Sequence, residues 1–227
     1  VGDTPLGPFR YQNNNPFSYK PGGFIPGAGH GSTMQDFYGN WWHTSTMVIA
    51  VNHQFERRIG LFPAGFDKDG ELFCNTAYGD WPLEIKEKMD PLADPKWMLL
   101  SYGKHVTVSS HKEGNEGMFA VDENVKTCWT PQSANLDEWL EVDLGQLMHV
   151  NAIQVNFADN HIPFNLPKGK TLKGDDYQKR YIDMDEAFTQ YVLEGSLDGK
   201  HYEIIADKQD ATTDLSHDFI ICNDNKI

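Results

Sequence analysis

A histidine surrounded by glycines is the first candidate for chemistry, at residues 27–32 with the sequence GAGHGS. Because glycine has no Cβ, it lets the backbone adopt positive φ and approach other groups closely. His30 therefore lies in a loop that could crowd a binding site. The alternative is a histidine satisfied by hydrogen bonds within a tight turn, and the hexapeptide alone leaves both open.

A second set of candidate side chains is Asp122, Asn124 and Thr127, within the sequence DENVKT. Carboxylate, amide, hydroxyl and carbonyl oxygens from one short loop are the ligands that hard cations prefer. The same residue types also favour an Asx-type turn held by its own hydrogen bonds. The spacing therefore predicts either a cation site or a turn.

Several aromatic side chains could stack on a sugar: Trp97, Trp129, Trp139 and His161. Trp129 and Trp139 lie in strand-like sequence, so we expect both in the hydrophobic core. His161 follows the polar sequence FADN, which predicts a loop tip. There it could contact a glycan or remain a solvated loop residue.

The charge balance limits the partners that these residues could serve. The 227 residues carry 19 basic and 33 acidic side chains, a formal net charge of −14. Phosphate backbones and anionic membrane surfaces need clustered Lys and Arg, so neither is an expected partner. No apolar run approaches the ~20 residues of a membrane-spanning helix. The three cysteines have no zinc or disulfide spacing, and we expect buried or semi-buried thiols.

The elements that position the candidates are expected to be β-strands, because Gly and Pro punctuate the chain and apolar residues alternate. In residues 1–82 we predict four strands that form an antiparallel meander, at 30–35, 41–52, 57–66 and 71–75. Asp67, Asp69 and Glu71 belong to the last hairpin, where we expect them to face solvent. Such a sheet is the form of one β-propeller blade.

Residues 83–96 contain two prolines and are predicted to be a stiff connector. Beyond it, residues 97–227 are predicted to form a β-sandwich. Its expected strands are 106–110, 138–144, 150–157, 187–196, 203–206 and 217–222. The predicted fold class is therefore all-β, with a partial propeller followed by a sandwich of jelly-roll type.

Residues 1–82 resemble the last blade of glycoside hydrolase family 43 in the segments 27–32, 37–44 and 57–70. These enzymes are five-bladed β-propellers that cleave arabinosyl and xylosyl linkages. The resemblance implies that His30 holds a central ion or water network beneath the sugar. It implies that Arg57 reaches the carboxylates of the −1 subsite, with Arg58 the weaker candidate. A solvated arginine pair beside Glu56 is the alternative.

The catalytic carboxylates of that family lie on earlier blades. Inverting hydrolysis needs two carboxyl groups about 6.5–9.5 Å apart, and no acidic residue of 1–82 matches the family's motifs. There is also no initiator methionine and no signal peptide. We therefore expect an inactive C-terminal fragment of a secreted, periplasmic or cell-surface glycosidase.

Residues 99–222 resemble a coagulation factor 5/8 type C domain, also called discoidin or carbohydrate-binding module family 32. The matching segments are 119–129, 139–145 and 193–199. The resemblance implies a galactose-binding-like jelly roll and a structural calcium ion held by Asp122, Asn124 and Thr127. The family's last two strands lack a counterpart, so we expect the sandwich to be truncated.

Taken together, the two resemblances imply part of a glycosidase acting on arabinose- or xylose-containing plant polysaccharide. The partner would be a polysaccharide or oligosaccharide, with calcium in the sandwich and a possible ion near His30. The alternative is a non-catalytic carbohydrate-binding or adhesion module. A third possibility is a sandwich that only buttresses the propeller.

Overall fold

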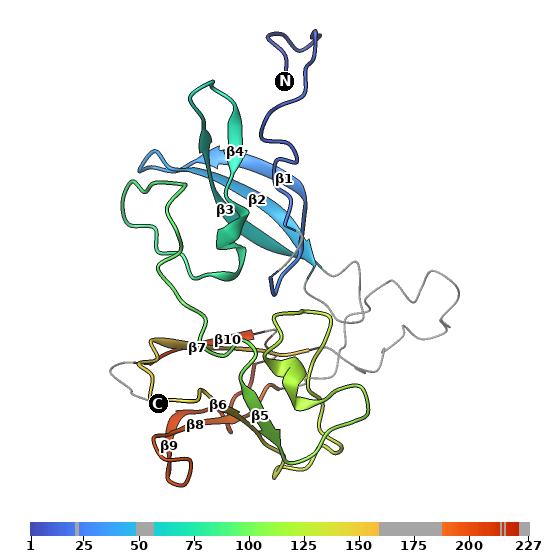
Figure 1. Ribbon diagram of the computed structural model, residues 1–227, viewed down its shortest axis with the longest axis vertical. Helices are drawn as coiled ribbons and strands as arrows, with labels where there is room; N and C mark the ends of the chain where they lie inside the picture. The colour runs from blue at the N-terminus through green and yellow to red at the C-terminus, as the bar shows by residue number, and fades with distance from the viewer. Residues whose placement is uncertain (21–22, 49–56, 159–187, 214, 216, 223–227) are drawn as a thin grey trace, which may run out of the picture. The chain divides into compact units, whose positions relative to one another are not determined.

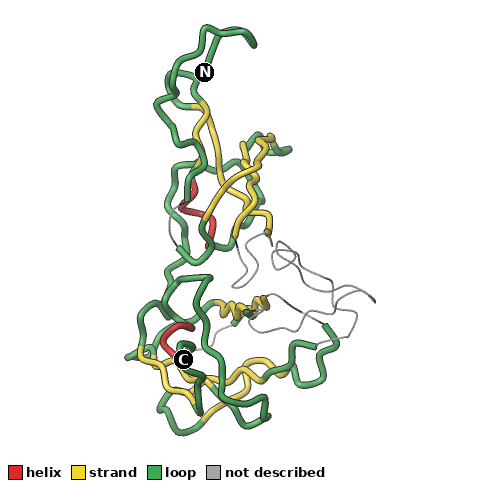
Figure 2. The backbone as a smooth tube through the Cα atoms, turned by 90° about the vertical axis from the view of Figure 1, so that its right-hand side faces the viewer, coloured by secondary structure: helices red, strands yellow, loops and turns green. Residues whose placement is uncertain are grey.

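The computed structural model describes residues 1–20, 23–48, 57–158, 188–213, 215 and 217–222. These residues form strands and loops, with two single-turn 3-10 helices, η1 (Thr76–Asp80) and η2 (Gly117–Ala120) (Figure 2). The predicted all-β class is confirmed. The chain divides into two compact units. Residues 1–48, 57–99 and 123–125 make up the first, and the second contains residues 100–122 and the described residues from 126 onward.

The first unit is built on one four-stranded antiparallel sheet with the strands in chain order (Figure 1). Its strands are β1 (Gly27–Gln35), β2 (Trp41–Val48), β3 (Arg57–Phe66) and β4 (Leu72–Cys74). The predicted meander is therefore confirmed, and β3 has the predicted bounds. Residues 49–52, the predicted end of the second strand, lie outside the described residues.

The core of the first unit lies against β2 and β3. Its largest fully buried side chains are Trp42, Met47, Phe62 and Pro63. Burying one such side chain contributes about 1.5–3 kcal/mol to folding. Position 60 favours glycine because a Cβ there would crowd the core, at 2.7 Å from Met47 Cγ and 3.0 Å from Phe62 Cζ.

The second unit contains three antiparallel strand pairs. The pairs are β5 (His105–Val108) with β6 (Leu140–Asp143), β7 (Ala152–Asn156) with β10 (His217–Ile221), and β8 (Val192–Ser196) with β9 (Tyr202–Asp207). Every strand predicted in this part has a counterpart among the described residues, although most are shorter than predicted. The pairs meet the expectation of a sandwich-type, all-β domain.

The two faces of the β5–β6 pair have different surroundings. On one face Val106 and Val108 pack on η2, since a Cβ at Gly117 would lie 3.0 and 2.7 Å from their Cγ1 atoms. On the other face His105 and Thr107 are exposed. Successive side chains of a strand point to opposite faces, so the packing of the valines determines which side chains reach solvent.

Candidate functional site

The glycine-rich segment around His30 forms the irregular first half of β1. Positive φ occurs at Gly27 (115°), Ala28 (99°) and His30 (48°), and the pairing with β2 shifts register on both sides of Gly29. The expectation of positive φ in this segment is therefore confirmed. The His30 side chain is exposed.

Among the described histidines, a different one is buried. His43 on β2 is 6% exposed, its Nδ1 lies 2.9 Å from Thr33 Oγ1, and its ring meets Phe17 edge-on at 4.7 Å between centroids. Burial lowers the pKa of His43, which favours the neutral imidazole. A Cβ at Gly31 would lie only 2.4 Å from His43 Nε2. Sequence reasoning missed this residue, although the alternation of WWHTST around it is the signal that could have found it.

Arg57 and Arg58 begin β3, where they lie opposite Val48 and Met47 of β2. As neighbours on one strand they belong to opposite faces. Arg58 is exposed, whereas the side chain of Arg57 lies outside the described residues. The structure thus places the backbone of Arg57 near one end of the β2–β3 ladder.

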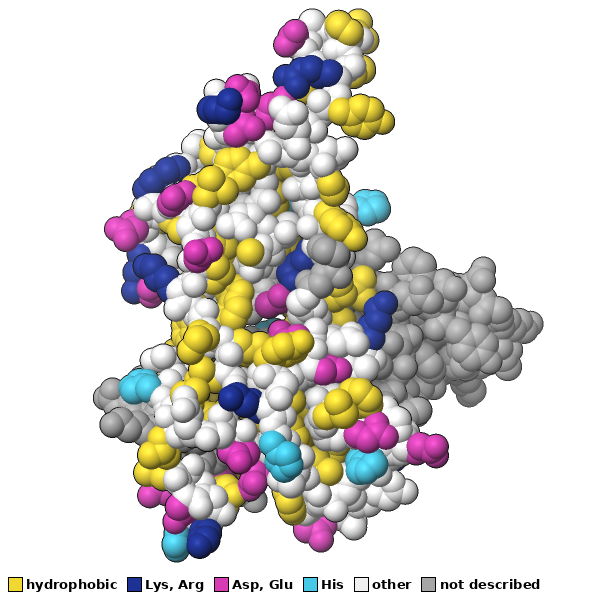
Figure 3. All heavy atoms as spheres, viewed as in Figure 1, with side chains coloured by type: hydrophobic (Ala, Val, Ile, Leu, Met, Phe, Trp, Pro, Cys, Tyr) yellow, Lys and Arg dark blue, Asp and Glu magenta, His cyan; other side chains and the backbone are white. Residues whose placement is uncertain are grey.

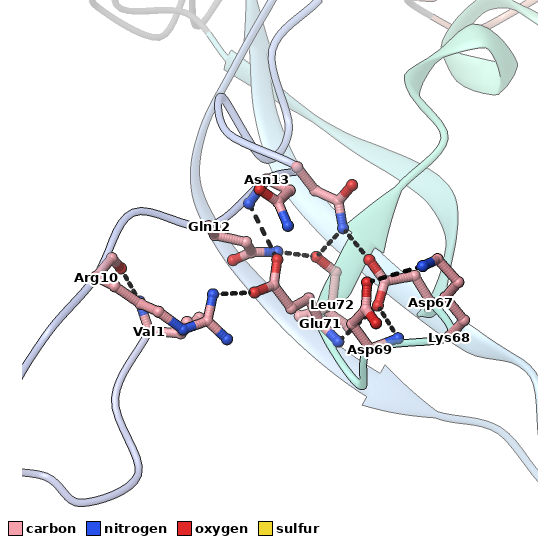
Figure 4. Close-up of polar contacts among 10 residues, drawn as sticks. Val1, Arg10, Gln12, Asn13, Asp67, Lys68, Asp69, Glu71 and Leu72 are labelled. Atoms are coloured by element: carbon pink, nitrogen blue, oxygen red, sulfur yellow. Dashed lines mark hydrogen bonds and ion pairs between the residues drawn. The ribbon is translucent and has the colours of Figure 1, made fainter.

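Glu71 is the one acidic residue of the β3–β4 hairpin that is buried, at 4% exposure (Figure 4). It accepts a hydrogen bond from the backbone N–H of Asn13 at 3.0 Å and pairs with the Arg10 guanidinium. These two contacts, Asn13 first, lower the pKa of Glu71. The expectation that this carboxylate faces solvent was wrong, because the N-terminal segment folds over the hairpin and covers it.

The same N-terminal segment makes further polar contacts with the hairpin. Asn14 Nδ2 donates to Asp67 Oδ2 at 3.0 Å, and Gln12 donates to the carbonyl oxygen of Leu72 (Figure 4). Asp67 also accepts the backbone N–H groups of Asp69 and Glu71, each at 2.9 Å. The cluster is therefore a polar clamp, with an ionised glutamate rather than a proton donor at its centre.

In the predicted cation loop, Asp122 and Thr127 are brought together. Thr127 Oγ1 donates to Asp122 Oδ2 at 2.7 Å, and Glu123 between them has φ of 56°. Asn124 lies in the same loop with its side chain exposed. One carboxylate and one hydroxyl oxygen thus converge, a contact that suits both of the predicted alternatives, a cation site and a turn. Nowhere in the described part of the chain do three His, Cys, Asp or Glu side chains cluster as a metal centre.

The exposed side of the β5–β6 pair gathers polar and aromatic side chains, and we call it the β5–β6 face. It consists of His105, Thr107, Trp139, Glu141, Asp143 and, from β9, Tyr202. Thr107 is opposite Glu141 and His105 opposite Asp143, and the N–H of Ser109 donates to the Trp139 carbonyl at 3.0 Å. Trp139 is 50% exposed. Its predicted place in the core was wrong, because Leu140 and Val142 take the inner face and alternation turns Trp139 outward.

The carboxylate of Glu138 holds the loop that precedes Trp139. Glu138 accepts hydrogen bonds from the hydroxyls of Ser109, Ser110 (2.6 Å) and Ser133 (2.7 Å). These hydroxyls, Ser109 first, lower the pKa of Glu138 to about 2. The Trp139 N–H in turn donates to Ser109 Oγ at 2.9 Å. The indole is therefore attached to a backbone held by several hydrogen bonds.

Tyr202 adds a second aromatic ring to the β5–β6 face. Its hydroxyl donates to Glu141, which also accepts from Thr107 Oγ1 at 3.3 Å. The hydrogen bond to the carboxylate raises the pKa of Tyr202. The ring remains 42% exposed. Glu141 thus holds the hydroxyl of Tyr202 and lies two residues from Trp139 on the β5–β6 face.

The remaining sugar-stacking candidates are placed elsewhere or not described. Trp129 is half-buried, and its Nε1 donates to the Ser110 carbonyl at 2.9 Å. Trp97 is 37% exposed and lies in the first unit. His161 lies outside the described residues.

Comparison with known proteins supplies one match. Residues 119–226 match the family model of the NedA-like, galactose-binding domain, an F5/F8 type C domain. Over these residues the chain is similar to galactose-binding-like domains. No curated protein and no solved structure was found to match. In the described residues, no helix is long and apolar enough to cross a membrane.

The galactose-binding-like match covers most of the residues singled out in the second unit. It includes the Asp122–Thr127 pair, Trp139 and Glu141, and Tyr202 on β9. Strand β5 lies before the matched residues. The resemblance of the second part to a factor 5/8 type C domain is thereby confirmed for residues 119–226.

Proposed function

We propose that the second unit binds carbohydrate. The observation that carries this proposal is the match of residues 119–226 to a galactose-binding domain. Two exposed aromatic rings beside a carboxylate acceptor support it, since sugar recognition combines apolar contact with a few placed polar groups. The net charge of −14 favours uncharged partners over anionic ones.

Affinity electrophoresis of the purified chain tests this proposal directly. Gels cast with galactan, arabinan or arabinoxylan should retard the chain, whereas a gel without polysaccharide should not. Calorimetry with the matching oligosaccharides then gives the dissociation constant. If the folded chain binds none of these glycans, carbohydrate binding is refuted.

We further propose that the chain is part of a glycosidase that acts on arabinose- or xylose-containing plant polysaccharides, and that it is secreted, periplasmic or at the cell surface. The four-stranded meander β1–β4 supports this, because one such sheet is the form of a propeller blade. In that role His30 and Arg57 would support an active site whose carboxylates come from other blades.

The chain alone should not hydrolyse aryl-arabinofuranosides or aryl-xylosides. General acid–base help is worth about 10²–10⁴-fold in rate, and the described hairpin glutamate is engaged with Arg10. Turnover by the purified chain that His30→Ala abolishes would overturn this assignment. A longer protein encoding further blades should hydrolyse at least one of the two substrates.

A structural calcium ion is the last element of the proposal. Asp122 and Thr127 would hold it with carbonyl oxygens of the same loop, and Asn124 would contribute a further oxygen. Bound calcium would cross-link the loop and stabilise the folded domain. The convergence of Thr127 Oγ1 and Asp122 Oδ2 at 2.7 Å supports this, although the same contact also suits a turn.

A further inference from the structure

We infer that the β5–β6 face is the surface on which the second unit binds its sugar, and that this sugar is neutral rather than acidic. The inference rests on the proposed carbohydrate binding and adds the place and the class of ligand. It starts from the contrast between the two faces of one strand pair. The inner face packs its valines on η2, whereas the outer face exposes a tryptophan and a tyrosine.

Trp139 has the properties of a stacking platform. Half of its surface is exposed, although a large aromatic side chain gains most by burial. The indole is carried by a backbone that Ser109 and the Glu138 cluster hold through hydrogen bonds. Because the backbone is already held, ordering it costs little when a ligand covers the ring.

The polar groups beside the ring suit the hydroxyls of a sugar. Trp139 and Glu141 share a face two residues apart, which is about 7 Å along a strand and comparable with the size of a monosaccharide. A sugar that stacks on the indole can therefore donate hydroxyl hydrogens to Glu141. Tyr202, whose hydroxyl already donates to Glu141, offers a second exposed aromatic ring beside that carboxylate.

The charge of this face favours a neutral ligand. Glu141 and Asp143 both belong to it, and His105 opposite Asp143 is the sole potential cation among its residues. Two carboxylates accept hydrogen bonds from neutral hydroxyls but repel the carboxylate of a uronic acid. On the side of the molecule that Figure 3 shows, acidic and hydrophobic side chains both reach the surface of each unit, with Lys, Arg and His side chains interspersed among them.

Calorimetry on the full chain tests both parts of the inference. The probes are neutral galacto-, arabino- and xylo-oligosaccharides, with oligogalacturonate as the acidic counterpart. Trp139→Ala should weaken binding of the best neutral oligosaccharide about tenfold or more, as truncation of a central aromatic contact does. Trp139→Phe should retain most of the affinity. Phe219→Ala is the matched control, because Phe219 is 39% exposed on β10, in a separate strand pair.

Hydroxyl-radical footprinting of the wild-type chain gives a second readout that does not depend on a variant folding. The bound neutral oligosaccharide should protect Trp139 and Tyr202 from oxidation and leave Phe219 unchanged. If a neutral sugar binds but Trp139→Ala binds as wild type and footprinting shows no protection, the location is wrong while carbohydrate binding stands. Tighter binding of oligogalacturonate would overturn the neutral class. Absence of binding to every probe would refute the proposed function itself.

Discussion

Replacing Gly31 by alanine should destabilise the first unit, whereas the same replacement at Gly29 should not. Both glycines belong to the GAGHGS segment of β1, so they share a sequence context. A Cβ at Gly31 would lie 2.3 Å from the carbonyl oxygen of Thr44 and 2.4 Å from His43 Nε2. A Cβ at Gly29 would have no atom within 4 Å.

The expected magnitude follows from what the new methyl group must displace. The Thr44 carbonyl belongs to the β2 backbone, and the buried His43 ring is held by Thr33 and Phe17. Neither neighbour can move without breaking a contact. Overpacking of this kind costs about 1–3 kcal/mol. At Gly29 the reduced freedom of the unfolded chain should instead stabilise by at most about 1 kcal/mol.

Thermal unfolding followed by tryptophan fluorescence measures the difference. In a unit of this size, 1 kcal/mol corresponds to about 4–8 °C in Tm. Gly31→Ala should therefore lower the Tm of the first unit by several degrees or more relative to Gly29→Ala. Hydrogen exchange in β2 would show whether the loss lies beside His43. If the two variants melt together, the close approach of Gly31 to His43 does not exist as described.

Two further predictions concern the polar clamp and the loop of the second unit. The pKa of Glu71 is lowered in the folded state, so the ionised carboxylate contributes fully to stability above its ordinary pKa near 4.5, and this contribution is lost as the pH falls below that value. Glu71→Gln should therefore be less stable than the wild type at neutral pH and should lose less stability on acidification. Urea denaturation from pH 7 to pH 3 measures this, and stability curves that run parallel for the two proteins would contradict it. Calcium at a hundredfold excess over Kd should stabilise the second unit by about 2.7 kcal/mol. Asp122→Ala should remove this effect. Identical thermal melting of the wild type with calcium and with chelator would exclude the metal.

Local sequence determined the strands and their order. The alternation in residues 138–144 and the DKDG turn at 67–70 are short-range signals, and both are found where they were predicted. The four-stranded meander followed from consecutive strands joined by short turns, because such strands pair with their neighbours. The motifs of residues 119–129 and 193–199 were sufficient to indicate the resemblance to a galactose-binding-like domain that the match at 119–226 confirms.

Long-range packing decided which side chains of those strands are buried. Glu71 looks like a turn residue in the sequence, but it is buried because Arg10 and Asn13, about sixty residues earlier, fold against it. Trp139 looks like a core residue by type, but the packing of β5 on η2 fixes the inner face and leaves the indole outside. Alternation predicts that two faces exist, whereas which face meets water depends on elements distant in the chain.

The candidate sites divide in the same way. The sequence by itself determined that Asp122 and Thr127 could share a ligand, because they lie five positions apart in one loop, and their oxygens lie 2.7 Å apart. It also indicated positive φ in the glycine-rich segment around His30, which Gly27, Ala28 and His30 itself adopt. Only the tertiary structure decided that the crowded histidine is His43, and that Tyr202 of β9 joins Glu141 of β6. Contacts between strands about sixty residues apart depend on how the sheets pack, and no local pattern encodes that arrangement.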